Sequence, residues 1–291
     1  LGAWRAGWRQ PSFLGHHDFA GLSAVATSLA LACIVATRAR TPAARLFWLA
    51  LVGGALGLVL AGSITSAAGL VLGAFVLWLA SRSRFAPSGR QTLALVAVVA
   101  VVAGGVTAVR GDSLAAFMRF LGLRGGQAAT GVESYSQRTV LSYIGLKIFE
   151  DHPIVGVGWQ RSSRPAVFEP HLAAARRRFP NVVPLAFPSR EHPWGVQNLY
   201  IQMLADAGVV GLALLLAVGA GGLALAWRTV NHASYPWAAG AGLAILCTLL
   251  TVAGEWASLG IVSGIPLQAA TCLALGLAAA GAATVEEESA V

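Results

Sequence analysis

The chain has 291 residues, of which 56% are hydrophobic and 11% are charged, and its mean hydropathy is +0.69. A water-soluble fold has too few polar side chains at this balance to cover its surface, so composition excludes soluble classes and predicts an integral membrane protein. The formal net charge is +8, and Lys147 is the only lysine. Arginine therefore provides the positive charge, which suits phosphate or diphosphate recognition and equally suits topology signals.

Apolar runs divide the chain, and each is close to the ~20 residues that cross a hydrocarbon core of ~30 Å. We predict spans at about 19–37, 46–61, 67–80, 93–109, 208–227, 237–255 and 261–283. The expected fold is all-α, a polytopic transmembrane helix bundle with one large extracytoplasmic loop that contains short amphipathic helices. The first eleven residues lack the pattern of a signal peptide, so the sequence is expected to be the C-terminal part of a longer protein.

The domain organisation follows from these runs. We expect an interfacial N-terminal segment (1–18), a first group of about four spans (19–109), an extracytoplasmic loop with the active site (110–200), a second group of about three spans (201–283) and an acidic cytoplasmic tail (284–291).

Arginines gather in the short loops after the first, third and fifth spans: Arg38, Arg40, Arg45, Arg82, Arg84, Arg90 and Arg228. These loops share one side, which the positive-inside rule makes cytoplasmic, so residues 110–200 face outside. That segment also has a basic excess, but the rule counts loops shorter than about 60 residues. Its excess charge therefore suggests an anionic ligand.

Charged residues are nearly missing from the interiors of the predicted spans, and Glu255 is the nearest to one. An ion-coupled transporter would be expected to place carboxylates or arginines at the midplane, so this pattern disfavours a transporter.

Residues 134–151 have the pattern of an amphipathic helix, with Arg138 on its polar side and an apolar stripe of Val140, Leu141, Ile144 and Ile148. We expect this helix to lie on the membrane surface. The sequence Gly156-Val157-Gly158 then predicts a tight turn. Residues 161–190 show no clear period, and the run 176–178, three arginines, favours a solvated basic face over a ligand role.

Three separated features together resemble the O-antigen ligase and O-antigen polymerase superfamily. They are the helix with Arg138, the turn at 152–158, and the run 197–211 that leads into a span. Members are polytopic enzymes with a large extracytoplasmic loop that transfer glycans from a polyprenyl diphosphate carrier to an acceptor.

The resemblance implies ligase-like or polymerase-like glycan transfer in cell-surface polysaccharide assembly, such as that of lipopolysaccharide, at the bacterial inner (cytoplasmic) membrane. The implied partners are an undecaprenyl or other polyprenyl diphosphate-linked glycan, a glycan or lipid acceptor, and membrane lipid, with no nucleic acid.

The chain departs from the family pattern at two places. The family typically has a histidine where this chain has Gln197, and an arginine in a Ser-Arg-Gly-like break where this chain has Ser66-Ala-Ala-Gly69. A glutamine amide is not a base near neutral pH. Three readings follow: His192 takes the part of the base, or the protein works mainly by positioning, or it is inactive.

Transfer from a polyprenyl diphosphate releases an anion that arginine stabilises, and it requires a base for the acceptor hydroxyl, which suits a histidine with a pKa near ~6.5. We therefore predict catalytic roles for His192, Arg138 and Gln197. Predicted substrate-binding residues are Arg161, Arg164, Arg190, Asn198 and Tyr200. Asn198 is also expected to cap or brace the entry to the fifth span.

Neither a metal nor another cofactor is expected. The acidic pair at 150–151 favours a helix end beside Pro153 over an ion site, and the three cysteines lie in apolar runs without metal-type spacing. The alternative function is a non-catalytic membrane protein of polysaccharide export or assembly that has lost the acid-base residue. Gln197 favours this alternative, whereas His192 and the loop arginines favour the enzyme.

Overall fold

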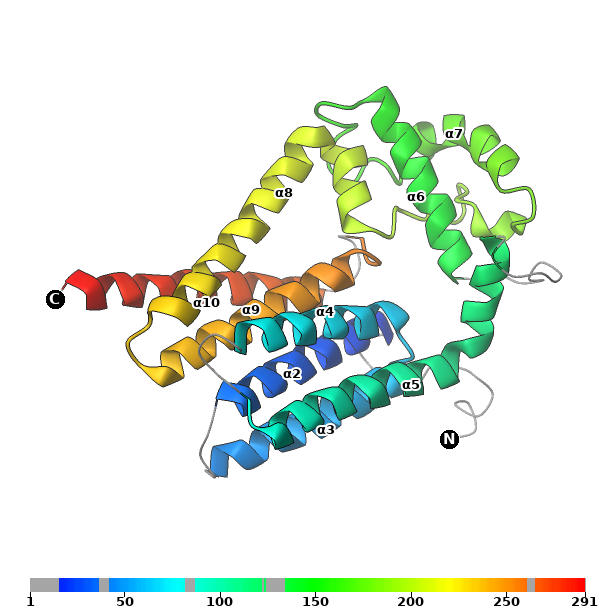
Figure 1. The fold of residues 1–291 in the computed structure, drawn as a ribbon. Coiled ribbons are helices and arrows are strands. Elements are labelled where there is room, and N and C mark those ends of the chain that lie inside the picture. The colour runs from blue at the N-terminus through cyan, green and yellow to red at the C-terminus, as the bar shows by residue number, and fades with distance from the viewer. Residues whose placement is uncertain are drawn as a thin grey trace. The chain divides into compact units, whose positions relative to one another are not determined.

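The computed structural model describes residues 16–36, 42–81, 87–121, 123, 134–260 and 265–290. Regular structure in this part of the chain is entirely helical, which confirms the all-α prediction (Figure 1). The helices are α2 (His16–Ala36), α3 (Pro42–Ala61), α4 (Ile64–Ser81), α5 (Gly89–Phe120), α6 (Ser134–Asp151), α7 (Pro165–Arg178), the 3₁₀ turn η1 (Pro184–Ala186), α8 (Leu199–His232), α9 (Pro236–Trp256) and α10 (Ile265–Ala290). Most of the predicted N-terminal segment and Arg38, Arg40, Arg82 and Arg84 lie outside the described residues.

Within the described ranges, five helices are long and apolar enough to cross a membrane: His17–Ala36, Gly89–Phe120, Leu199–His232, Pro236–Trp256 and Ile265–Glu287. Two shorter apolar helices, Arg45–Ala61 and Ile64–Leu79, lie between the first two. The protein is therefore a polytopic helical membrane protein.

Three helices, α5, α8 and α10, extend well beyond the predicted spans. α5 continues past Val109 to Phe120, and α8 begins at Leu199 and has a kink at Gly208, where the fifth span was predicted to start. α10 continues to Ala290 through the acidic residues expected to form a separate tail. Glu286, near the end of α10, accepts a hydrogen bond from Arg228 of α8.

The chain forms two compact units. The membrane unit lies within residues 1–109, 218–255 and 263–291, and the loop unit comprises residues 110–217 and 256–262. The domain expectation of a loop ending at residue 200 was drawn from hydropathy alone, whereas the loop unit also includes the first half of α8.

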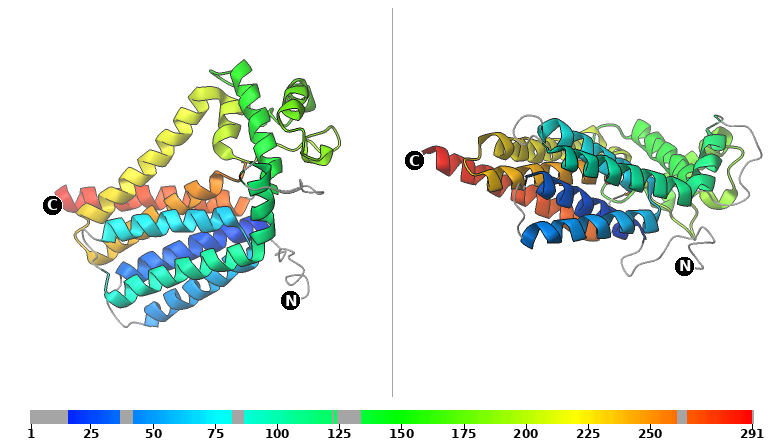
Figure 2. Two further views of the ribbon diagram at one scale, coloured as in Figure 1. Left: turned by 45° about the vertical axis from the view of Figure 1, so that its right-hand side comes forward. Right: turned by 60° about the horizontal axis from the view of Figure 1, so that its bottom comes forward.

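In the membrane unit, α2, α3, α4 and α9 run side by side (Figures 1 and 2). Glycines permit close approach between these helices. A Cβ atom at Gly54 would lie 2.4 Å from the Thr27 hydroxyl oxygen, and one at Gly254 would lie 2.7 Å from the Cα of Gly69. The small residues noted in the sequence thus serve helix packing.

Polar side chains in the membrane unit are mostly hydroxyls that bond within their own helix. Thr27, Thr248 and Thr251 each donate to the carbonyl four residues earlier. Glu255, 1% exposed, accepts a hydrogen bond of 2.9 Å from Ser66, the first residue of the break that differs from the family pattern. Internal pairing of this kind is what a low-dielectric surrounding requires.

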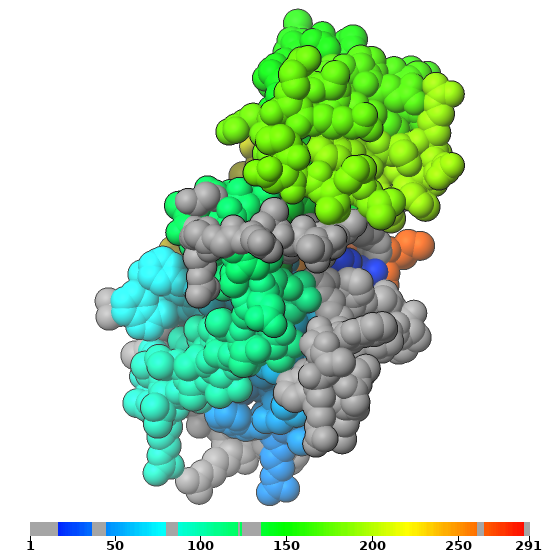
Figure 3. Space-filling model, turned by 90° about the vertical axis from the view of Figure 1, so that its right-hand side faces the viewer, coloured from blue at the N-terminus to red at the C-terminus, as the bar shows by residue number. Residues whose placement is uncertain are grey.

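The loop unit has a small core of its own, built around α6. The predicted helix is confirmed with the expected bounds, and its apolar stripe is buried. Val140, Ile144 and Ile148 of this stripe pack against Phe168 and Ala175 of α7 and against Phe187. α7, a helix that the sequence did not predict, therefore packs against α6, and the position of α6 on the membrane surface stays a prediction. Figure 3 shows the packed side chains of this unit in green and yellow-green.

Candidate functional site

Two of the predicted catalytic residues meet in the loop unit. Arg138 lies on the second turn of α6 and is 9% exposed, and its Nε–H donates a hydrogen bond of 3.0 Å to the Oε1 atom of Gln197. A hydrogen bond from a charged donor is worth about 1.5–3 kcal/mol when buried. Because the bond fixes the Nε edge of a planar guanidinium, it also sets the direction of the whole group.

Segments next to Gln197 hold it against α6. A Cβ atom at Gly145, on the same side of α6 as Arg138, would lie 2.8 Å from Val196 and 3.0 Å from Ile201. Glycine at this position therefore lets the segment before α8 and the first turn of α8 approach the helix closely. This close packing brings Gln197 to Arg138.

Asn198 caps α8, as the sequence predicted. Its Oδ1 atom accepts the backbone N–H of Ile201 at 3.0 Å, and its Nδ2 donates to the carbonyl of Ala257 at 2.7 Å. The cap satisfies one of the free N–H groups of the first turn and joins that turn to the residue that follows α9. Tyr200, on the same turn, is half-buried, and substrate contact by either residue stays a prediction.

The glycine turn after α6 packs directly on the kink of α8. Gly156 and Gly208 both have φ of +65°, and a Cβ atom at Gly208 would lie 2.1 Å from the carbonyl oxygen of Ile154. The N–H groups of Val157 and Gly158 donate to the carbonyls of Ala205 and Asp206. Two family-like motifs, separated in sequence, therefore form one backbone-bonded junction.

Asp206 is the buried acid of this junction. It is 1% exposed, and its carboxylate accepts the backbone N–H groups of Gln160 at 3.1 Å and Ser162 at 2.9 Å, with the Gln202 amide at 3.3 Å. Gln160 has φ of +53°, an unfavourable conformation for a residue with a Cβ. The carboxylate stabilises this conformation by charge-assisted hydrogen bonds.

Arg161 and Arg164 lie on the segment that Asp206 holds. Both are exposed, and the Arg161 side chain lies back over Gly158, where a Cβ atom would be 2.9 Å from its Cδ. Arg164 is the residue before α7, and its carbonyl accepts the N–H groups of Val167 and Phe168. These contacts do not test whether Arg161 and Arg164 bind substrate, so that role stays a prediction.

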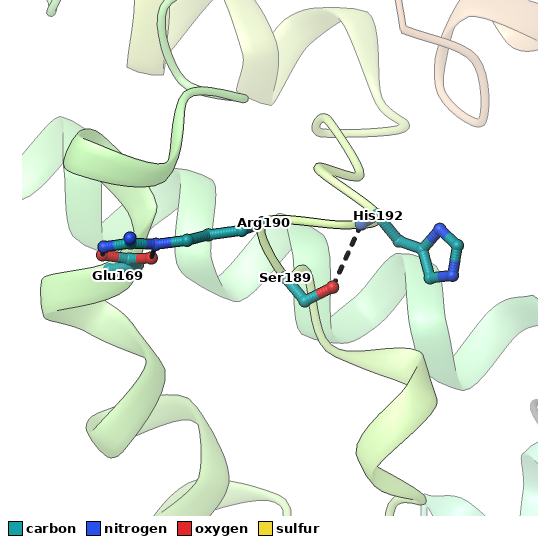
Figure 4. Close-up of polar contacts among 4 residues, drawn as sticks. All are labelled: Glu169, Ser189, Arg190 and His192. Atoms are coloured by element: carbon teal, nitrogen blue, oxygen red, sulfur yellow. Dashed lines mark hydrogen bonds and ion pairs between the residues drawn. The ribbon is translucent and has the colours of Figure 1, made fainter.

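Arg190 and His192 lie on an exposed stretch between η1 and α8, and their side chains point in opposite directions (Figure 4). Arg190 makes a bidentate contact with Glu169 of α7, at 2.7 and 3.1 Å. This contact lowers the pKa of Glu169 from its ordinary value, chiefly through the hydrogen bond from Arg190. The guanidinium of Arg190 is thus paired with the carboxylate of Glu169, and its predicted contact with substrate stays a prediction.

His192 receives support from its neighbours in sequence. Its backbone N–H donates to the Ser189 hydroxyl at 3.1 Å, and its ring stacks on Trp194 with centroids 5.8 Å apart. We expected its ring to approach Gln197 or Arg138, and the contacts described for it are with Ser189 and Trp194 instead. Its role as a base stays a prediction.

The acidic pair at the end of α6 makes local contacts. Glu150 pairs with Lys147, and Asp151 lies 3.7 Å from the Nε2 atom of His171. No group of three or more His, Cys, Asp or Glu side chains suited to a metal ion occurs among the residues that the structure describes. The helix does end at Asp151, as its sequence indicated.

Comparison with protein-family models matches residues 48–216 to the O-antigen ligase family, and this range is more than half of the chain. The chain belongs to the O-antigen ligase family. The match includes Arg138, Gln197 and the junction at Asp206. A comparison with curated proteins found no match. Family membership supports glycan ligase-like or glycosyltransferase-like activity, with a lipid-linked glycan and an acceptor as the general substrates.

Proposed function

We propose that this member of the O-antigen ligase family transfers a glycan from a polyprenyl diphosphate carrier to a glycan or lipid acceptor, without a metal ion. We also propose that it does so at the outer face of the bacterial inner membrane. The observation that supports this best is the hydrogen bond between Arg138 and Gln197. It joins a buried cation to the position where the family has its histidine.

Arg138 suits the carrier's diphosphate for two reasons. Its burial removes competing water, so that its attraction for an anion is stronger than that of a surface arginine. Its guanidinium presents N–H groups in a plane that matches two phosphate oxygens. Charge that develops on the leaving diphosphate would then be stabilised by a group that is already oriented.

Gln197 acts in this proposal as a positioning residue. Its amide oxygen accepts from Arg138, so it orients the cation and does not remove a proton. This geometry supports an orienting role for Gln197, so that proton removal from the acceptor is left to another side chain.

His192 remains the candidate base. His171 contacts Asp151 at the far end of α6, and the helix rises about 20 Å from Arg138 to that residue. His192 is five positions from Gln197, a reach of at most about 17 Å. The acceptor hydroxyl would lose its proton to the imidazole while the glycan's anomeric carbon separates from the diphosphate oxygen.

Binding of the carrier tests the proposal directly. Full-length protein in lipid nanodiscs is titrated with undecaprenyl diphosphate and with undecaprenyl monophosphate and observed by native mass spectrometry. We expect tighter binding of the diphosphate, and we expect Arg138→Ala to weaken it by about tenfold or more. Arg177→Ala removes an exposed arginine of α7 and serves as the matched control.

Unchanged diphosphate affinity in Arg138→Ala would remove this residue from the site. Transfer of glycan in reconstituted vesicles should continue at the same rate in EDTA, and loss of transfer that Mg²⁺ restores would contradict metal independence. If carrier binds but no acceptor is modified by protein with intact Arg138 and His192, the non-catalytic alternative holds.

A further inference from the structure

A cavity of about 480 Å³ lies within the loop unit, between the end of α5, the polar side of α6 and the segment after α7. Three aromatic rings line it. The rings of Phe120 and Phe179 stack with centroids 5.6 Å apart, and Tyr143 meets Phe179 edge-on at 5.4 Å. The volume falls within the roughly 300–1,000 Å³ typical of small-molecule sites.

The rest of the lining is mixed: Leu121, Leu146, Pro180 and Val182 are apolar, and Thr139, Ser142, Arg178 and Asn181 are polar. The Thr139 hydroxyl donates to the carbonyl of Tyr135 at 2.8 Å and can still accept, and Arg178 and Asn181 belong to the end of α7 and the segment beyond it. Arg178 lies over the ring of Phe179, 5.8 Å from its centroid. Both Arg178 and Asn181 are exposed, so each can turn toward a ligand at small cost.

This combination matches the chemistry of a sugar. A pyranose ring has faces of C–H groups, whose slight positive charge suits the negative face of an aromatic ring. Its rim of hydroxyls both donates and accepts, as do the amide and hydroxyl groups of the lining. The exposed guanidinium of Arg178 and amide of Asn181 favour a ligand with hydroxyl groups over an isoprenoid tail, which offers neither of them a hydrogen-bond partner.

The cavity also lies next to the proposed diphosphate site along α6. At about 100° per residue, Thr139, Ser142, Tyr143 and Leu146 share one face of the helix, opposite its buried stripe. Ser142 follows Arg138 by four residues, so the two lie one turn apart, about 6 Å along the axis. A sugar joined to a diphosphate at Arg138 would therefore reach Ser142.

We propose that this cavity is a subsite for the sugar residues of the donor glycan. The inference rests on the proposed function, because it needs the diphosphate at Arg138 to place the glycan. It goes further by assigning recognition of the glycan to Arg178, Asn181 and Ser142.

The test compares two forms of one carrier. Full-length protein in nanodiscs is titrated with undecaprenyl diphosphate bearing an oligosaccharide and with the bare undecaprenyl diphosphate. We expect the double variant Arg178→Ala, Asn181→Ala to weaken binding of the glycan-bearing form about tenfold and to leave the bare form unchanged. Arg177→Ala, which alters the adjacent exposed arginine, should change neither. Ser142→Trp, which fills the cavity, should act like the double variant.

Thermal unfolding of each variant shows whether it is folded, and the exposed positions of Arg178 and Asn181 keep the double variant interpretable if Ser142→Trp fails. Equal affinity of the folded double variant and the wild type for the glycan-bearing form would overturn the subsite. Wild-type protein that binds neither form would overturn the diphosphate proposal instead. If the wild type binds neither carrier, binding of the free oligosaccharide is measured by saturation-transfer NMR. Binding that the double variant abolishes would assign the cavity to an acceptor glycan and overturn the donor assignment.

Discussion

The two units of this protein differ in how they hold their polar groups. In the membrane unit, threonines such as Thr248 and Thr251 bond to carbonyls one turn back in their own helix, and side-chain bonds also join Ser28 to Thr251 and Ser66 to Glu255. In the loop unit, Arg138 reaches Gln197 across 59 positions, and Asp206 reaches Ser162 across 44. Bonds within a helix need no partner segment, whereas these bonds of the loop unit join a charged side chain to a distant segment.

This difference explains where chemistry is expected. Helices surrounded by hydrocarbon must pair every polar group internally, and short hydroxyls do so without a charge. The loop unit holds the buried charged residues Arg138 and Asp206 in bonds between segments, whereas the membrane unit holds the buried acid Glu255 in a bond from a hydroxyl. We therefore expect the membrane unit to act as a scaffold and the loop unit to bind the ligand.

Topology provides the largest test, since it decides whether the loop unit lies on the outer face of the membrane. Tags placed at Arg84 and Arg228 should report cytoplasm, and a tag near Pro170 should report the outside, because the arginines of the short loops orient the spans. Accessibility to a membrane-impermeant reagent measures this. A cytoplasmic signal from Pro170 would overturn the assignment of the loop unit.

The next test concerns His192, an exposed histidine of the loop unit. We expect His192→Ala to lower the transfer rate by about 10²- to 10⁴-fold, the usual contribution of a positioned base, with expression and membrane insertion unchanged. His232→Ala, at the end of α8, is the matched control. Gln197→His should retain or raise the rate, because it restores the family's residue. A wild-type rate in His192→Ala would leave catalysis to the arginines alone.

Asp206→Ala should have a smaller effect, on folding of the loop unit. The change leaves the N–H groups of Gln160 and Ser162 without their acceptor, at about 1–3 kcal/mol for each buried group left unsatisfied. Limited proteolysis near residues 156–162 and thermal unfolding measure it. Asp151→Ala removes an exposed acid of α6 and should be close to neutral. If both variants resist protease equally, Asp206 does not hold the turn.

The smallest effect is expected at the surface pair of Glu169 and Arg190. Because Arg190 lowers the pKa of Glu169 below 4.5, the pair stabilises the folded state above about that pH, and this contribution is lost as the pH falls through the lowered pKa. The pair is exposed, so the change in stability is small. Unfolding measured between pH 6 and pH 3 should show less pH dependence in Arg190→Ala. An unchanged profile would mean that the pair does not persist in solution.

Local features of the sequence predicted much of the fold. The helix at 134–151, the glycine turn and the Asn198 cap all depend on residues a few positions apart, so pattern was sufficient. α7 was not predicted because Pro165 and Pro170 obscured its period. Pro165 is compatible with the first turn, where a backbone N–H would have no partner in the helix, and Pro170 lies inside the helix.

The contacts of the site depend on the tertiary fold and were not predictable in the same way. Asp206 lay within the motif that identified the family, yet its buried position follows only from the packing of Gly156 on the α8 kink. Arg138 and Gln197 were chosen separately from the sequence, and their hydrogen bond became evident only from the fold.

In the proposed function, the planar guanidinium of Arg138, oriented by Gln197, binds the carrier diphosphate in the loop unit. The most direct measurement is the rate of glycan transfer by purified Arg138→Lys in reconstituted vesicles, beside wild type and Arg177→Lys. Lysine keeps the charge but has no planar fork, so we predict a fall of about 10²- to 10³-fold for Arg138→Lys and no change for the control. Transfer by folded Arg138→Lys at the wild-type rate would contradict the account.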